Sequence, residues 1–150
     1  MTMSDVYAEH HLAVYRCLLA WTRNPALAEE LTAETFYRAI VADQPVRAAS
    51  ARGYLIAIAR NALRKFQAKR GREEALVADA VAPHQSNEAA LDLQRTLAAL
   101  ATLPEEWKEP LVLYAQGGLG YEEIAAQLNI TLATVKIRIH RARRKLESYR

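Results

Sequence analysis

The sequence has few of the residues that interrupt or cross-link a fold. Its 150 residues include five glycines, five prolines and one cysteine, whereas 51% of the residues are hydrophobic. Few chain breakers among many apolar residues are typical of compact helices rather than of a disordered chain. Because Cys17 is the only cysteine, an intrachain disulfide is excluded, and we expect this residue to be a small buried hydrophobe in a reducing environment.

Signals for a membrane protein or an enzyme are also missing. No apolar run approaches the roughly 20 residues that span a bilayer, and no cationic leader opens the chain, so we expect a cytoplasmic protein without a membrane segment. There is no glycine-rich phosphate loop and no nucleophile with a placed base. His10 and His11 have no third ligand at a suitable spacing. We therefore expect no enzyme activity, no catalytic residue, no cofactor and no bound metal.

The positive charge is concentrated in two stretches. Residues 47–72 hold eight of the 20 Lys and Arg and no acid, and residues 131–150 hold seven against Glu147 alone. Residues 73–130, in contrast, hold ten of the 17 acids. Two cationic patches separated by an acidic stretch predict two contacts with one polyanion.

The stretch 119–146 has the pattern of a helix-turn-helix. Residues 121–128 predict a short amphipathic helix, Asn129 tolerates the left-handed conformation of a tight corner, and Thr131 is a good N-cap for a second helix from Leu132. One stripe of that helix is apolar and the opposite face is cationic, as in a helix that reads DNA. The alternative is an αα-hairpin with a solvated basic face, but such a face usually mixes charge signs.

The periodicity assigns the two sides of this second helix. Its buried stripe is expected to consist of Leu132, Val135, Ile139, Ala142 and Leu146. The residues expected to face DNA are Thr134, Lys136, Ile137, Arg138, His140, Arg141, Arg144 and Lys145.

Three helices are expected before residue 71. The first runs from Asp5 to about Arg23 with Ser4 as its cap, the second follows the cap Asn24, and the third follows Ser50. The buried stripe of the third helix is expected to consist of Leu55, Ile58, Ala59, Ala62 and Phe66. Its other side carries unbalanced positive charge with Tyr54, and it could follow phosphates while a base is stacked. A plain basic surface is the alternative.

The second of these helices has a less usual pattern. Leu27 and Leu31 lie beside Glu30, Glu34 and Arg38, and exposed leucines among acids would suit docking to a partner protein. In the alternative, the leucines pack on the first helix and Glu34 pairs with Arg38 along the helix. The pattern fits both interpretations equally well.

Apolar periodicity lapses over 71–87, which we interpret as a linker. It returns at 88–103, and Pro104 begins a further helix that ends before Gly117. The expected fold class is therefore all-α, with two small helical domains joined by the linker.

The order of these motifs resembles the extracytoplasmic-function (ECF) class of bacterial RNA polymerase sigma factors, in the sigma-70 family. The resemblance runs through AEELTAETFYRAI (28–40), ARGYLIAIARNALRKF (51–66) and the stretch 97–146 that begins LAALATLPEEW. It implies that 1–70 is sigma region 2, which docks on the polymerase clamp and opens the promoter at the minus-ten element. It implies that 88–150 is sigma region 4, which reads the minus-thirty-five element. The implied partners are core RNA polymerase, promoter DNA and an anti-sigma factor.

The resemblance also implies site residues. The clamp-binding positions would fall on Glu29, Glu30, Leu31, Glu34, Thr35 and Phe36, which favours the docking interpretation of Leu31. The minus-ten positions would fall on the 43–50 loop and on Arg60, Asn61 and Arg64, with Tyr54 where the family often has Trp. The minus-thirty-five readers would fall on Thr134, Lys136, Ile137, Arg138 and Arg141. A stand-alone helix-turn-helix repressor or activator is the alternative function, and it would bind a palindromic site as a homodimer without polymerase.

Overall fold

The computed structural model describes residues 2–42, 50–72 and 88–148. In these ranges the backbone forms helices and no strand, so the all-α prediction is confirmed. The chain divides into two compact units, Met1–Ala82 and Pro83–Arg150. The predicted 43–50 loop and 71–87 linker lie outside the described residues, apart from Ser50 and the end of the third helix. The predicted domain boundaries at 70 and 88 stay predictions.

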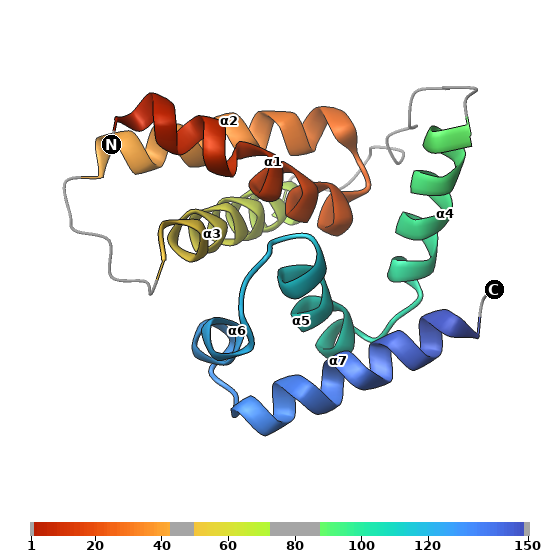
Figure 1. Cartoon of the computed structure of the whole chain (residues 1–150). Coiled ribbons are helices and arrows are strands. Elements are labelled where there is room, and N and C mark those ends of the chain that lie inside the picture. The colour runs from red at the N-terminus through yellow and green to blue at the C-terminus, as the bar shows by residue number, and fades with distance from the viewer. Residues whose placement is uncertain (1, 43–49, 73–87, 149–150) are drawn as a thin grey trace. The chain divides into compact units, whose positions relative to one another are not determined.

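The first unit is a bundle of α1 (Met3–Thr22), α2 (Pro25–Val41) and α3 (Ala51–Arg72), each packed against the other two (Figure 1). Helix α1 begins earlier than expected, because Thr2 rather than Ser4 is its cap. The Thr2 hydroxyl accepts from the Asp5 amide at 3.1 Å, and the Thr2 amide donates to the Asp5 carboxylate at 3.1 Å. Of Thr2 and Ser4, only Thr2 has an acid three residues on, so only Thr2 can form this reciprocal capping box, which also lowers the Asp5 pKa.

Helix α2 begins as predicted. The Asn24 side chain accepts from the Leu27 amide at 3.2 Å, and Pro25 occupies the first helical position, where its missing N–H costs nothing. The core of this unit is formed by Val14, Cys17, Leu18, Ala28, Leu31, Phe36, Leu55, Ile56, Ala59, Ala62 and Leu63.

The buried stripe of α3 differs from the predicted one. Ile56 and Leu63 are buried, whereas Ile58 and Phe66 are only half-buried. Helix α3 packs against two helices at once, so its apolar arc is broad and is centred between them rather than on one neighbour. Phe66 lies further along the helix, where the Arg70 guanidinium stands 5.8 Å from its ring centroid.

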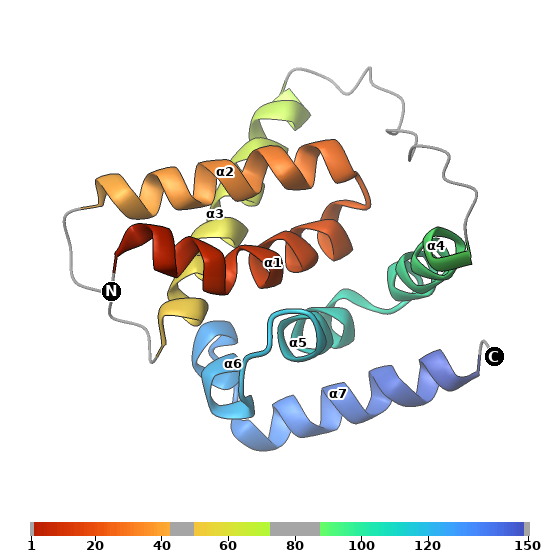
Figure 2. The same cartoon turned by 45° about the horizontal axis from the view of Figure 1, so that its top comes forward.

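The second unit contains α4 (Glu88–Ala101), α5 (Glu105–Ala115), α6 (Tyr121–Leu128) and α7 (Leu132–Glu147). Helix α7 crosses α5 and the short α6, and all three pack on one another (Figures 1 and 2). Pro104 is the N-cap of α5 rather than its first residue, and Pro110 is accommodated inside that helix. The core of α5, α6 and α7 is formed by Leu111, Val112, Leu113, Leu119, Ile124, Val135, Ile139 and Ala142.

Candidate DNA and polymerase interfaces

Helices α6 and α7 meet at a tight corner that the sequence predicts. Asn129 is left-handed, with φ 57° and ψ 46°, and the Ile130 amide then donates to the Ala125 carbonyl at 3.1 Å. The Thr131 hydroxyl accepts from the Thr134 amide at 3.1 Å and so caps α7. The expected helix-turn-helix geometry is therefore confirmed. Gly120 is the N-cap residue of α6, and it has no side chain that could accept a capping hydrogen bond.

The buried stripe of α7 is shorter than predicted, because Leu132 at its start is exposed and Leu146 at its end is only half-buried. Val135, Ile139 and Ala142 are at most 1% exposed and hold the helix against α5 and α6. Leu132, expected in this stripe, is 37% exposed because the first turn of α7 lies at the edge of an open groove. The groove has a volume of about 650 Å³ and is lined by Tyr114, Gly120, Tyr121, Glu122, Glu123, Leu132 and Lys136.

The opposite side of α7 is exposed, as predicted. Lys136, Ile137, His140, Arg141 and Arg144 are exposed, and Ile137 is an apolar residue in the middle of this cationic face. An exposed face of this composition can lie in the major groove, where cations meet phosphates and guanine edges and an apolar side chain meets a thymine methyl group.

Thr134 and Lys145 are half-buried at the flanks of this face. The Thr134 hydroxyl lies 2.8 Å from the Thr131 hydroxyl, so it forms part of the helix cap. The role of Thr134 in reading DNA stays a prediction.

Two cations of α7 lie against α5. A guanidinium nitrogen of Arg138 lies 3.8 Å from the Glu106 carboxylate, and the guanidinium of Arg143 stands 5.2 Å from the Tyr114 ring centroid. The Tyr114 ring is in turn 5.0 Å from that of Tyr121 on α6. Arg138 is half-buried, so this predicted DNA reader also lies beside an acid of α5. The sequence carries no local signal for either contact, because the partners lie on different helices.

The predicted minus-ten residues of α3 share one side of that helix. Tyr54 and Asn61 are seven residues apart, close to two full turns, and Arg64 follows Asn61 by nearly one turn. Asn61 and Arg64 are exposed, whereas Tyr54 and Arg60 are half-buried. The side of α3 away from its core therefore presents an aromatic ring, an amide and cations together, a combination that can stack and hydrogen-bond a base.

The predicted exposure of Leu31 on α2 is wrong. Leu31 is 4% exposed, and Leu27 is half-buried. The reason is that α2 packs against both α1 and α3, so its buried arc is wide enough to include Leu31, Thr35 and Phe36. Glu34 pairs with Arg38, whose Nε donates to the Glu34 carboxylate at 2.9 Å, as the alternative interpretation expected.

Other apolar residues are exposed on α2, and the sequence reasoning missed them. Tyr37, Ile40 and Val41 are 65%, 59% and 57% exposed. Tyr37 follows Glu30 by seven residues, so the two share a side of the helix, and this spacing was the available signal. Glu29 and Glu30 are exposed as well. The outer side of α2 therefore combines acids with large apolar side chains, although not the leucines expected.

None of the described helices is long and apolar enough to cross a membrane. Within the same residues, no group of three or more His, Cys, Asp and Glu side chains is placed to hold a metal ion.

These features define a two-unit helical DNA-binding protein, and comparison with known proteins identifies its class. Residues 6–73 match the family described as Sigma-70 region 2, and residues 93–146 match Sigma-70, region 4. The chain is 30% identical over 154 residues to the ECF RNA polymerase sigma factor SigM of Bacillus subtilis, covering 99% of this chain and 94% of SigM. This chain therefore belongs to the ECF RNA polymerase sigma factors of the sigma-70 family.

Two further relatives extend this result. The ECF sigma factor SigE of Mycolicibacterium smegmatis is 36% identical over 157 residues, covering 97% of this chain, which spans 60% of the length of SigE. The structure of the sigma factor RpoE of Bartonella quintana, solved in complex with the anti-sigma factor NepR, matches with a TM-score of 0.81 and 27% identity. That match covers 97% of this chain and 94% of RpoE. Because both units match sigma regions, the stand-alone repressor is set aside.

Proposed function

We propose that this chain directs core RNA polymerase to promoters by contacting DNA with two helices, α3 at the minus-ten element and α7 at the minus-thirty-five element. The proposal rests on how the two sides of α7 differ. Its one side is sealed against α5 and α6 by Val135, Ile139 and Ala142, and its other side exposes cations around Ile137. The chain acts by binding rather than by catalysis, and it works in the cytoplasm, where its DNA and polymerase are.

We assign different roles to two arginines of α7. Arg141 lies in the middle of the exposed face and reads a base edge, whereas Arg144 lies nearer the C-terminal end and contacts phosphate. Arg141→Ala should therefore weaken binding to the preferred duplex by about 1–3 kcal/mol and relax the preference at one base pair. Arg144→Ala is the matched control: it should weaken binding to all duplexes alike and reduce the salt slope by about one.

Titrations of the full chain on preferred and scrambled duplexes, at several salt concentrations, separate these outcomes. Equal losses on both duplexes for Arg141→Ala would show that this residue positions the helix and reads nothing.

The polymerase-binding surface proposed for α2 is its outer side. It is supported by the exposed apolar residues Tyr37, Ile40 and Val41, on the side of α2 that also carries Glu29 and Glu30 toward its start. Leu31, Thr35 and Phe36 support this surface from beneath, because they are buried. Ile40→Ala should weaken binding to core RNA polymerase without unfolding the first unit, since removing an exposed side chain changes stability by about 0.5 kcal/mol or less.

Leu12→Ala is the matched control for this surface, because Leu12 is 47% exposed on α1. Binding is measured by co-elution and by fluorescence anisotropy of the labelled chain. The assignment fails when Ile40→Ala and Leu12→Ala bind the polymerase equally well.

An anti-sigma factor is the regulatory partner we propose, supported by the similarity to RpoE, whose structure holds NepR. Such a partner should compete with core RNA polymerase for the chain. Affinity purification from the cells that express it, followed by addition of core polymerase, tests this. A purification in which no co-purifying protein is displaced by core polymerase would count against it.

A further inference from the structure

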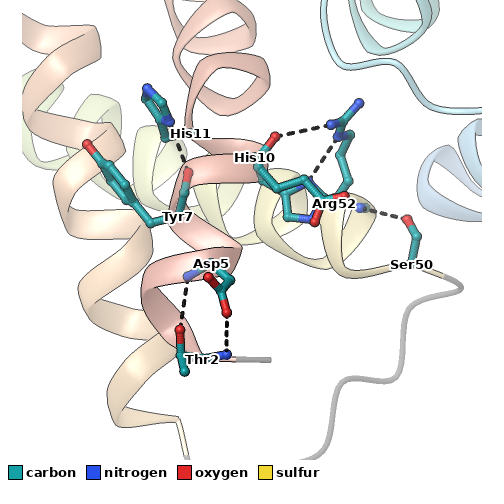
Figure 3. A network of polar contacts seen from close by, with 9 residues as sticks. Thr2, Asp5, Tyr7, His10, His11, Ser50 and Arg52 are labelled. Carbon is teal, nitrogen blue, oxygen red and sulfur yellow. Dashed lines mark hydrogen bonds and ion pairs between the residues drawn. The ribbon is translucent and has the colours of Figure 1, made fainter.

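The beginning of α3 is fastened to α1 by one arginine. From the first turn of α3, the Arg52 Nε donates to the His10 Nδ1 at 3.1 Å, and its Nη2 donates to the Glu9 carbonyl at 3.3 Å (Figure 3). The His10 residue is only 8% exposed. Beside this contact, the Ser50 hydroxyl accepts from the Gly53 amide at 3.0 Å, and the Ser50 carbonyl accepts from the Tyr54 amide at 3.1 Å. The first turn of α3 is thus held both along the helix and across to α1.

This geometry requires a neutral histidine. A guanidinium has only donors, so the His10 Nδ1 must accept, and the ring proton must be on Nε2. Burial and then the Arg52 charge lower the His10 pKa below its ordinary value of 6.5, while Glu9, whose carboxylate is 3.7 Å from Nε2, acts in the opposite direction. Among the described residues, these charges come from α3 and from α1 itself, and none comes from α2.

A proton on Nδ1 would oppose the contact. It turns the acceptor into a donor that faces the Arg52 N–H, and it places two cations side by side. Arg52 would keep only its bond to the Glu9 carbonyl, which does not orient the guanidinium by itself. The first turn of α3 would then lose its hydrogen bond to the His10 ring, while its bonds to Ser50 remain.

We propose that His10 and Arg52 are positioning residues that hold the start of α3 on α1, and that protonation of His10 releases it. The effect of this release on the minus-ten residues of α3 follows from the stiffness of a helix. Arg52 is two residues before Tyr54 and about two and a half turns before Asn61, so a change at the first turn alters where these side chains point. This part of the inference rests on the proposed role of α3 at the minus-ten element.

The first test uses hydrogen exchange in the full chain, read at the Gly53 and Tyr54 amides. Protection in the parent should fall as the pH drops below 6.5, by up to tenfold per pH unit, because release takes up one proton. His10→Asn places a neutral acceptor near the position of Nδ1, so its protection should match that of the parent at pH 8 and should not change with pH. His10→Leu has no acceptor and should be poorly protected at every pH.

His11→Asn is the matched control. His11 is the adjacent histidine on α1, but its Nδ1 bonds to the Tyr7 carbonyl at 2.9 Å rather than to α3 (Figure 3). It should therefore behave like the parent. The inference is overturned when His10→Asn keeps the pH dependence of the parent, or when His10→Leu is as well protected as the parent at pH 8.

The second test measures promoter opening with core RNA polymerase, using 2-aminopurine fluorescence in the minus-ten element between about pH 6 and pH 8. The opening rate with the parent should fall toward low pH relative to the rate with His10→Asn, in the same pH range as the exchange change. Equal pH profiles for the two chains would overturn the positioning role. A chain that opens no promoter under any condition overturns the proposed function instead, and the exchange profiles then decide the His10 contact on their own.

Discussion

Truncation to alanine should have different effects at two isoleucines of α7: a loss of stability at Ile139 and a loss of DNA preference at Ile137. Ile139 is 1% exposed and packs in the core of the second unit, whereas Ile137 is 48% exposed on the opposite side of the helix, which we propose to face DNA. Truncating a buried isoleucine to alanine costs about 2–5 kcal/mol, because the apolar transfer free energy is lost and a cavity is left. Ile137→Ala should change the free energy of unfolding by no more than about 0.5 kcal/mol, since it removes exposed atoms and introduces a better helix former.

The size of the first effect decides whether the second unit survives. At about 0.05–0.15 kcal/mol per residue, residues 88–148 have a stability of about 3–9 kcal/mol. Ile139→Ala should therefore remove roughly half of that stability and still leave a folded majority at 25 °C. Ile137→Ala should instead reduce the preference for the cognate duplex, because a contact with a thymine methyl group is lost.

The assay uses the two tryptophans of the chain, Trp21 in the first unit and Trp107 in the second. In a Trp21→Phe background, urea unfolding followed by fluorescence reports on the second unit alone. Binding to cognate and scrambled duplexes is measured on the same proteins. Similar unfolding midpoints for Ile137→Ala and Ile139→Ala would refute the assignment of the two sides of α7.

Three further outcomes follow from local geometry. Thr131→Ala should destabilise the second unit by about 1 kcal/mol, because the hydroxyl that caps α7 is lost, and a melting temperature unchanged from the parent would contradict this. Gly120→Ser should stabilise it by about 0.5 kcal/mol, since a Cβ at Gly120 meets nothing within 4 Å and the serine can cap α6; a lower urea midpoint would show that the cap does not form. Burial raises the pKa of the Cys17 thiol to about 12, so at pH 8 it should react with a disulfide reagent only in denaturant, and rapid reaction of the native chain would argue against the packing of α1.

The sequence by itself determined the elements that depend on neighbours along the chain. The caps Asn24 and Thr131, the left-handed Asn129 and the spacing of Val135, Ile139 and Ala142 on α7 all depend on at most about two turns of helix. Local spacing therefore predicted the helix-turn-helix, the exposed side of α7 and the grouping of Asn61 with Arg64 on α3. These are the parts of the candidate site whose geometry is set by the helical period alone.

Only the tertiary structure decided which side chains lie between helices. Leu31 is buried because α2 has two neighbours, and the exposed apolar surface of α2 is consequently formed by residues near its C-terminal end, such as Ile40. Arg138 meets Glu106 across 32 positions of sequence, and Arg52 meets His10 across 42. No periodic pattern encodes such pairs, because the register between two helices is set by how their side chains pack. The packing of separate helices therefore decided which cations of this sigma factor face outward and which hold its helices together.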